Sequence, residues 1–210
     1  MGGVKESDAL RRSRLELLGS AAAGIAHDLN NQFTLILNYL AAGDVSSARE
    51  AVARCASLTS GLLAYCRGES TPLRPVDPAA LVRRFAASLH PGTGIRVRVE
   101  VEGEPRAVLA DEMAIERALD NLTRNACAAM NGIGTIRFRV QPGLIEVEDS
   151  GPGIPAENLK RIFEPFFSTR GSGLGLAIVR EVMRQHGGAV TVDSTVGKGA
   201  KFSLHLRRAA

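Results

Sequence analysis

The chain has 210 residues, of which 45% are hydrophobic and 23% charged, and its formal net charge is +4. This composition is typical of an ordinary globular protein with room for one large domain or two small ones, each able to bury a core. The basic residues are scattered and lack interleaved aromatic residues, which argues against a nucleic-acid-binding protein.

Cysteine usage and hydropathy indicate a compartment. Cys55, Cys66 and Cys127 are odd in number and form no CxxC pair, which favours reduced thiols over disulfides or a zinc site. The longest nearly apolar run, residues 17–26, is too short to span a bilayer. We therefore expect a soluble, cytoplasmic protein without a membrane segment in this chain.

A long amphipathic helix is predicted over about residues 7–42. His27 lies two residues from apolar residues on both sides, so it points away from the packing stripe, with Asn31 on its own face and Asp28 beside it. An exposed imidazole next to a carboxylate is suited to chemistry, although a lone histidine of this kind is more often an ordinary surface residue. The stripe, with steps of three and four, consists of Leu15, Leu18, Ala22, Ile25, Leu29, Phe33, Ile36 and Leu40.

A second helix is predicted after a turn at Gly43 and Asp44. Ser46 or Ser47 would cap it, and it would end by Gly68. Two helices alone cannot close a core, because one apolar face would remain in water. We therefore expect the helical hairpin of residues 1–68 to pair with a second copy as a dimeric four-helix bundle.

The remaining chain has a mixed pattern. Residues 69–76 are predicted as a linker, and residues 77–210 as a second domain. Its strands and helices do not alternate regularly, which favours an α+β two-layer sandwich with helices on one face over a doubly wound sheet. Helices are expected over residues 77–89, 111–130 and 175–186, and strands over 95–101, 135–140, 144–148, 189–193 and 200–206.

A pair of asparagines is the first chemical signal in this domain. Asn121 and Asn125 stand four residues apart on a predicted helix, so their amides share a face. Amide oxygens are hard ligands that suit Mg²⁺, which usually reaches proteins through few side chains together with phosphates. Such a pair alone is more often two ordinary asparagines on a helix surface.

A carboxylate followed by glycines is the second signal. Asp149 ends a predicted strand, and Gly151 and Gly153 follow it, which allows the backbone to approach a ligand closely. A carboxylate in that place is suited to accept a hydrogen bond from the exocyclic amine of adenine. The same DxGxG pattern also occurs in common turns.

A glycine-rich segment, residues 171–176, is the third signal and opens a predicted helix. Closely spaced glycines before a helix N-terminus expose amide donors to phosphate oxygens. The pattern alone is weak, and no predicted strand precedes it as in a dinucleotide fingerprint. The preceding phenylalanines of residues 163–167 fit either core or the hinge of a lid, from which Arg170 would reach the terminal phosphate.

In this order the segments resemble those of a bacterial histidine protein kinase of two-component signalling. Residues 121–125 resemble its asparagine box, 149–153 its first glycine box, 163–167 its phenylalanine box and 171–176 its second glycine box. Residues 24–31 resemble its phospho-acceptor helix. Each box is weak alone, but their combination with the histidine helix is specific and covers about residues 15–207.

The resemblance implies a dimerisation and histidine-phosphotransfer hairpin followed by an ATP-binding domain of the type shared with gyrase and a heat-shock chaperone. His27 would accept the γ-phosphoryl group, Asp28 would orient the imidazole and help remove its proton, and Asn125 would ligate Mg²⁺. Asp149 would recognise adenine. The other nucleotide contacts would come from Asn121, Gly151, Gly153, Phe166, Arg170, Gly171, Gly173, Leu174 and Gly175.

The implied reaction ends on a partner protein. The phosphoryl group of His27 would pass to an aspartate of a response-regulator receiver domain, and Asn31 matches the position that in such kinases places water for dephosphorylating that partner. Two alternatives remain open: an enzyme acting mainly as a response-regulator phosphatase, and a module that binds ATP only as a conformational switch. The chain departs from the family where residues 127–129 offer no basic residue after the asparagine box, a role that Arg124 or Arg170 would then take.

Overall fold

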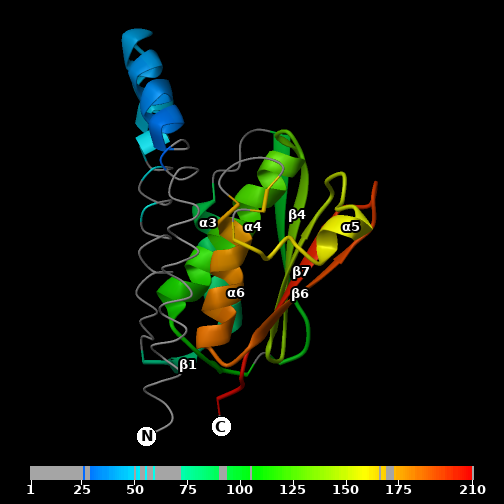
Figure 1. Cartoon of the computed structure of the whole chain (residues 1–210). Coiled ribbons are helices and arrows are strands. Elements are labelled where there is room, and N and C mark those ends of the chain that lie inside the picture. The colour runs from blue at the N-terminus through cyan, green and yellow to red at the C-terminus, as the bar shows by residue number, and fades with distance from the viewer. Residues whose placement is uncertain are drawn as a thin grey trace, which may run out of the picture. The chain divides into compact units, whose positions relative to one another are not determined.

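Figure 1 shows a computed structural model of the chain. The structure describes residues 26, 29–49, 51–52, 55, 59, 72–89, 94–104, 106–165, 167–168 and 173–209. The chain divides into two compact units: residues 1–69 with 164–174, and residues 70–163 with 175–210.

The helical hairpin of the first unit turns at Gly43. Residues 29–41 are helical, Gly43 has a left-handed φ of 75°, and the helix resumes at Val45. The cap of this second helix is Asp44, whose Oδ1 accepts a hydrogen bond from the Ser47 amide at 3.0 Å. The prediction of a Ser46 or Ser47 cap was therefore wrong, because the glycine ends the turn earlier and leaves Asp44 as the last residue before the helix.

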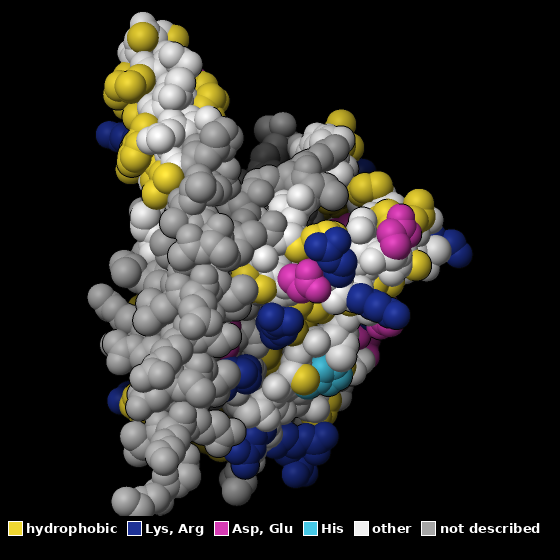
Figure 2. All heavy atoms as spheres, in the orientation of Figure 1, with side chains coloured by type: hydrophobic (Ala, Val, Ile, Leu, Met, Phe, Trp, Pro, Cys, Tyr) yellow, Lys and Arg dark blue, Asp and Glu magenta, His cyan; other side chains and the backbone are white. Residues whose placement is uncertain are grey.

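The two faces of this hairpin differ in exposure. Ile36 and Tyr39 are half-buried, and Ala48 and Ala51 of the following helix are buried. A stripe of larger side chains on residues 29–41 is open instead, and Figure 2 shows hydrophobic side chains on this part of the hairpin. The exposed fractions are 52% for Phe33, 67% for Leu37 and 52% for Leu40.

A five-stranded sheet in the order β2-β4-β5-β7-β6 forms the second unit. The strand β2 is parallel to β4, and the other neighbours are antiparallel. The strands are β2 (Gly94–Val101), β4 (Ile133–Gln141), β5 (Leu144–Asp149), β6 (Ala189–Ser194) and β7 (Ala200–His205).

Three helices cover one face of this sheet, as Figure 1 shows: α3 (Pro78–Ser88), α4 (Glu112–Ala129) and α6 (Gly175–Gln185). Phe85 of α3 meets Phe138 of β4 edge to face, with ring centroids 5.9 Å apart. His186, just after α6, is buried; its Nε2 accepts the Asp111 amide at 3.0 Å, and its Nδ1 lies 2.7 Å from the Val182 carbonyl. The α+β sandwich with helices on one face is confirmed.

The other face of the sheet is charged, and the sign alternates from strand to strand. Arg139 and Lys201 flank Glu146 at 3.0 and 3.3 Å. Burial raises the pKa of Glu146, but hydrogen bonds from Lys201 and Arg139 outweigh burial and leave the pKa below its ordinary value. Opposite charges on neighbouring strands favour this strand order. The alternating set is Glu100 and Glu102 on β2, Arg137 and Arg139 on β4, Glu146 and Glu148 on β5, Lys201 on β7 and Asp193 on β6.

Three short elements were not predicted: β1 (Arg74–Val76), β3 (Val108–Ala110) and α5 (Ala156–Leu159). The strand β1 lies within the segment expected to be a linker and pairs with β3. A strand of this length carries too few residues to show alternation, and its proline is compatible with a small edge pairing. The predicted helices and strands of residues 77–210 agree with the structure to within one or two residues. Among the residues that the structure describes, no helix is both long and apolar enough to cross a bilayer.

Candidate nucleotide-binding site

Two asparagine side chains of α4 converge on the first residue of α6. A Cβ atom placed on Gly175 would lie 3.2 Å from Oδ1 of Asn121 and 3.7 Å from Oδ1 of Asn125. The Nδ2 of Asn121 donates to the Arg117 carbonyl at 2.9 Å, which fixes the orientation of that amide. Both amide oxygens therefore point to the same place, as the spacing predicts, and glycine at position 175 leaves the space beside them open.

The N-terminus of α6 adds hydrogen-bond donors to this place. The first turn of α6 carries no acidic side chain. The first backbone amides of a helix have no partner within the helix, and together with the positive end of the helix dipole they are suited to an anion. Gly173, which precedes the helix, has a left-handed φ of 65°. Amide oxygens for a cation thus stand next to amide donors for phosphate.

Asp149 ends β5 and is only 7% exposed. Its Oδ1 accepts a hydrogen bond from the Gly151 amide at 2.8 Å. Burial raises the pKa of Asp149, and hydrogen bonds from the Gly151 and Ala200 amides counter this effect only in part. Because a carboxylate accepts more bonds than these, Asp149 retains acceptor capacity for a ligand amine.

Glycines shape the backbone around this carboxylate. A Cβ on Gly151 would lie 2.7 Å from Oδ1 of Asp149 and 3.4 Å from Cγ of Met130. Gly153 has a φ of 74°, and a Cβ there would collide with the Thr195 carbonyl. Both positions therefore require glycine for close packing, in addition to any approach of a ligand.

Residues not singled out from the sequence also line this loop. Ser150 Oγ accepts the Thr135 amide at 2.9 Å and lies 3.5 Å from Sδ of Met130, which is buried at the end of α4. A methionine at the end of an amphipathic helix is ordinarily core, so no sequence signal marked it. Ser194 joins the same loop from β6.

The structure describes some of the other predicted site residues and not others. His27, Asp28, Phe166, Arg170 and Gly171 lie outside the described residues. Asn31 is exposed on the helical residues 29–41, and Leu174 immediately precedes α6.

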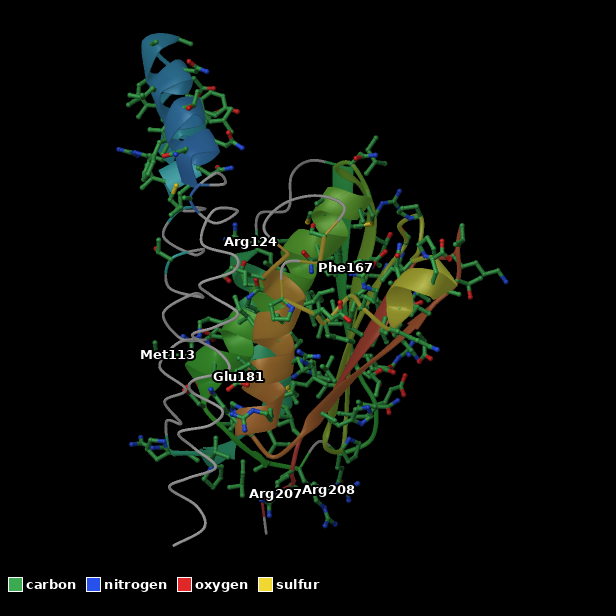
Figure 3. All side chains as sticks on the ribbon, viewed as in Figure 1. Met113, Arg124, Phe167, Glu181, Arg207 and Arg208 are labelled. Atoms are coloured by element: carbon green, nitrogen blue, oxygen red, sulfur yellow. The ribbon has the colours of Figure 1, made fainter. Side chains whose placement is uncertain are left out.

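Two side chains near the predicted site residues in the sequence interact with residues outside the site. Arg124, labelled in Figure 3, is next to Asn125 on α4 and pairs with Asp120 at 2.8 Å. Phe163 stacks edge to face on Phe202, with centroids 6.4 Å apart, so the first ring of the phenylalanine box packs against the sheet.

Comparison with known proteins identifies the family. Residues 110–210 match the family described as "Histidine kinase-, DNA gyrase B-, and HSP90-like ATPase". A solved mycobacterial sensor histidine kinase, MprB, is 33% identical with a TM-score of 0.55, and the match covers 65% of this chain and 99% of that chain. The chain belongs to the sensor histidine kinases.

Further sensor histidine kinases resemble the chain over nearly its whole length. The sensor kinase CckA of Brucella abortus is 34% identical over 97% of this chain and 25% of its own length. The solved histidine kinase ThkA in complex with response regulator protein TrrA is 25% identical with a TM-score of 0.74, over 98% of this chain and 66% of that chain. The chain thus spans a quarter of the length of CckA and less than half the length of other curated kinases that it matches.

Proposed function

We propose that the chain is an ATP-dependent protein histidine kinase that phosphorylates His27 and passes the phosphoryl group to an aspartate of a response-regulator receiver domain. The observation that carries this proposal is the convergence of the Asn121 and Asn125 oxygens on the N-terminus of α6. A metal-bound triphosphate needs such a combination of hard oxygen ligands and amide donors. Membership of the sensor histidine kinases supports it.

Different residues would bind the adenine base, the phosphates and the metal ion. Asp149 would accept a hydrogen bond from the adenine amine, with Gly151 and Gly153 shaping the loop beside the base. The amides around Gly171, Gly173, Leu174 and Gly175 would bind the phosphates, and Phe166 and Arg170 would close over them. Asn125, with Asn121 beside it, would hold Mg²⁺, which supplies charge neutralisation along the phosphates.

The reaction at His27 is an in-line displacement. One ring nitrogen attacks the γ-phosphorus, a nitrogen–phosphorus bond forms, the bond to the bridging oxygen breaks, and ADP leaves. Asp28 would hold the proton on the other ring nitrogen, so that the attacking nitrogen keeps a free lone pair, and would help remove that proton as the nitrogen–phosphorus bond forms. The carboxylate therefore acts by orientation as well as by charge.

Incubation with γ-labelled ATP and Mg²⁺ tests this function. The protein should acquire label that is lost in acid and stable in base, as phosphohistidine is, and that moves to an added receiver domain. His27→Gln should acquire none, because glutamine has no nucleophilic nitrogen. Absence of label from the unaltered protein would leave the two alternatives, a response-regulator phosphatase and an ATP-binding switch, and equal label in His27→Gln would exclude the assignment of His27.

We infer further that the hairpin forms a homodimer. Phe33, Leu37 and Leu40 follow one another at helical spacing, and each is more than half exposed. Burying such a stripe against a second copy gives the four-helix bundle that two helices cannot form alone. The copies would share a symmetric interface.

Sedimentation equilibrium tests the homodimer. The unaltered chain should sediment as a dimer, and Leu37→Glu should shift it to monomer, because a charge would be buried in the interface. Asn38→Glu is the matched control, since it adds the same charge one residue away and off the stripe. A dimer that is unaffected by Leu37→Glu would contradict this interface.

A receiver domain fits as partner because ThkA was solved with a response regulator protein. Asn31 is exposed on the helical residues 29–41, four residues after His27 in the sequence, and is our candidate for placing water during dephosphorylation of that partner. A cytoplasmic location follows from the need for ATP and for such a partner.

A further inference from the structure

The turn between β6 and β7, residues 194–199, holds the loop that follows Asp149. Ser194 Oγ accepts a hydrogen bond from the Ile154 amide at 2.8 Å and donates one to the Gly199 carbonyl at 2.7 Å. The Gly197 amide donates to the Pro152 carbonyl at 2.7 Å. One lone pair of the Ser194 hydroxyl thus joins the turn to the loop, and its single proton ties the two ends of the turn together.

Backbone contacts between the turn and the loop are equally close. A Cβ on Gly153 would collide with the Thr195 carbonyl, and a Cβ on Gly199 would collide with the Asp149 carbonyl. Both glycines have left-handed φ values, 74° and 85°. Residues 151–155 form neither helix nor strand, so these contacts with the turn, rather than a regular hydrogen-bond ladder, hold the loop in shape.

Hydrogen bonds of Ser194 connect the segments on the two sides of the Asp149 carboxylate. The Gly151 amide donates to it from the loop, and on the β7 side the Ala200 amide lowers the pKa of the carboxyl group. Ser194 links these two sides, because it binds the loop at Ile154 and also binds Gly199, the neighbour of Ala200. Loss of the Ser194 hydroxyl would remove one hydrogen bond on each side of the carboxylate.

We propose that Ser194 is a positioning residue for ATP, which holds the loop of residues 150–154 and the Asp149 carboxylate in the geometry that receives the adenine base. This role rests on the proposed ATP site. Ser194 acts through the loop without touching the nucleotide. It should therefore affect how tightly ATP binds, and hardly affect the chemical step once ATP is bound.

A pair of equal-shaped substitutions in the full chain tests the role. Ser194→Thr keeps the hydroxyl, while Ser194→Val has nearly the same shape without it. The dissociation constant and KM for Mg-ATP should rise about five- to tenfold in Ser194→Val, with kcat at saturating ATP within about twofold of the unaltered chain. Ser194→Thr should restore near-normal binding, and amide hydrogen exchange at Ile154 should be faster in the valine variant alone.

A serine on the neighbouring strand provides the control. Ser203 of β7 is buried, and its hydroxyl lies 3.4 Å from Oε1 of Glu146 on the charged face, so Ser203→Ala should leave ATP binding unchanged. Equal ATP affinity in Ser194→Val and Ser194→Thr, measured below their unfolding temperatures, would overturn the positioning role. If the unaltered chain binds no ATP, the proposed function fails and this role with it; normal ATP binding by both the unaltered chain and Ser194→Val overturns the role alone.

Discussion

Replacing Asn125 by alanine should slow autophosphorylation by about 100- to 1000-fold, because a metal ligand contributes several kcal/mol to the stability of the transition state. The fold should be unaffected. Asn125 is exposed on α4, and alanine is the better helix former. The unfolding temperature of Asn125→Ala should therefore equal or exceed that of the unaltered chain.

Single-turnover labelling at saturating Mg-ATP measures this effect. Asn38→Ala is the matched control, since Asn38 is also an exposed asparagine within a helix and belongs to the hairpin. The control should be labelled at the normal rate. A rate for Asn125→Ala within about threefold of normal would show that its amide is not a metal ligand in the reaction, since such a change is under 1 kcal/mol.

Replacing Asp149 by asparagine should nearly abolish ATP binding and also make the nucleotide-free chain more stable at neutral pH. The loss of binding follows from geometry. The Gly151 amide engages Oδ1, so asparagine would present its NH₂ group in place of the second carboxylate oxygen, which in the proposed site would face the adenine amine. Two donors would then oppose each other, and we expect the affinity for ATP to fall by about 100-fold.

The gain in stability follows from the raised pKa of Asp149, whose ordinary value is 3.8. A raised pKa in the folded state means that folding favours the protonated carboxyl. Its favourable contribution is full below the pKa of the unfolded chain and is lost as the pH rises through the folded pKa. Asparagine is neutral at every pH, so the stability gained in Asp149→Asn should be small in acid. The gain should increase between the pKa of Asp149 in the unfolded chain and its pKa in the folded chain, and stay constant above the folded pKa.

Denaturant unfolding without nucleotide, from acid to neutral pH, measures this difference. Glu148→Gln is the control: Glu148 is the adjacent residue of β5 and pairs with Arg137 at 2.9 Å on the charged face. Glu148→Gln should bind ATP normally and be no more stable than the unaltered chain. Normal ATP affinity in Asp149→Asn, or a loss of stability that appears only towards neutral pH, would contradict the environment described for Asp149.

Local signals in the sequence were sufficient for most of the second unit. Asp77 and Asp111 stand at the predicted starts of α3 and α4, and in the structure both cap these helices with side-chain hydrogen bonds to the first turn. The spacing of Asn121 and Asn125 placed both on one helix face, which the structure confirms. The short elements β1, β3 and α5 were missed because a few residues show no periodicity.

The sequence did not predict which residues of distant strands pair with one another. The pairing of Asp149 with Ala200 brings the β6–β7 turn against the loop of residues 150–154, and no local pattern predicts that pairing. Ser194 was therefore not a candidate, although it makes two hydrogen bonds there. At Asp44, three neighbouring residues were capable of capping, and the left-handed Gly43 decided among them.

Mapping the phosphorylated residue by mass spectrometry, under neutral to basic conditions after one turnover with ATP and Mg²⁺, tests the assignment of His27 most directly. We expect a single phosphoryl group on the peptide that contains His27, carried by the imidazole, and almost none in Asn125→Ala. A phosphoryl group on any other residue, or undiminished phosphorylation in Asn125→Ala, would contradict transfer from an ATP site built on Asn125 to His27.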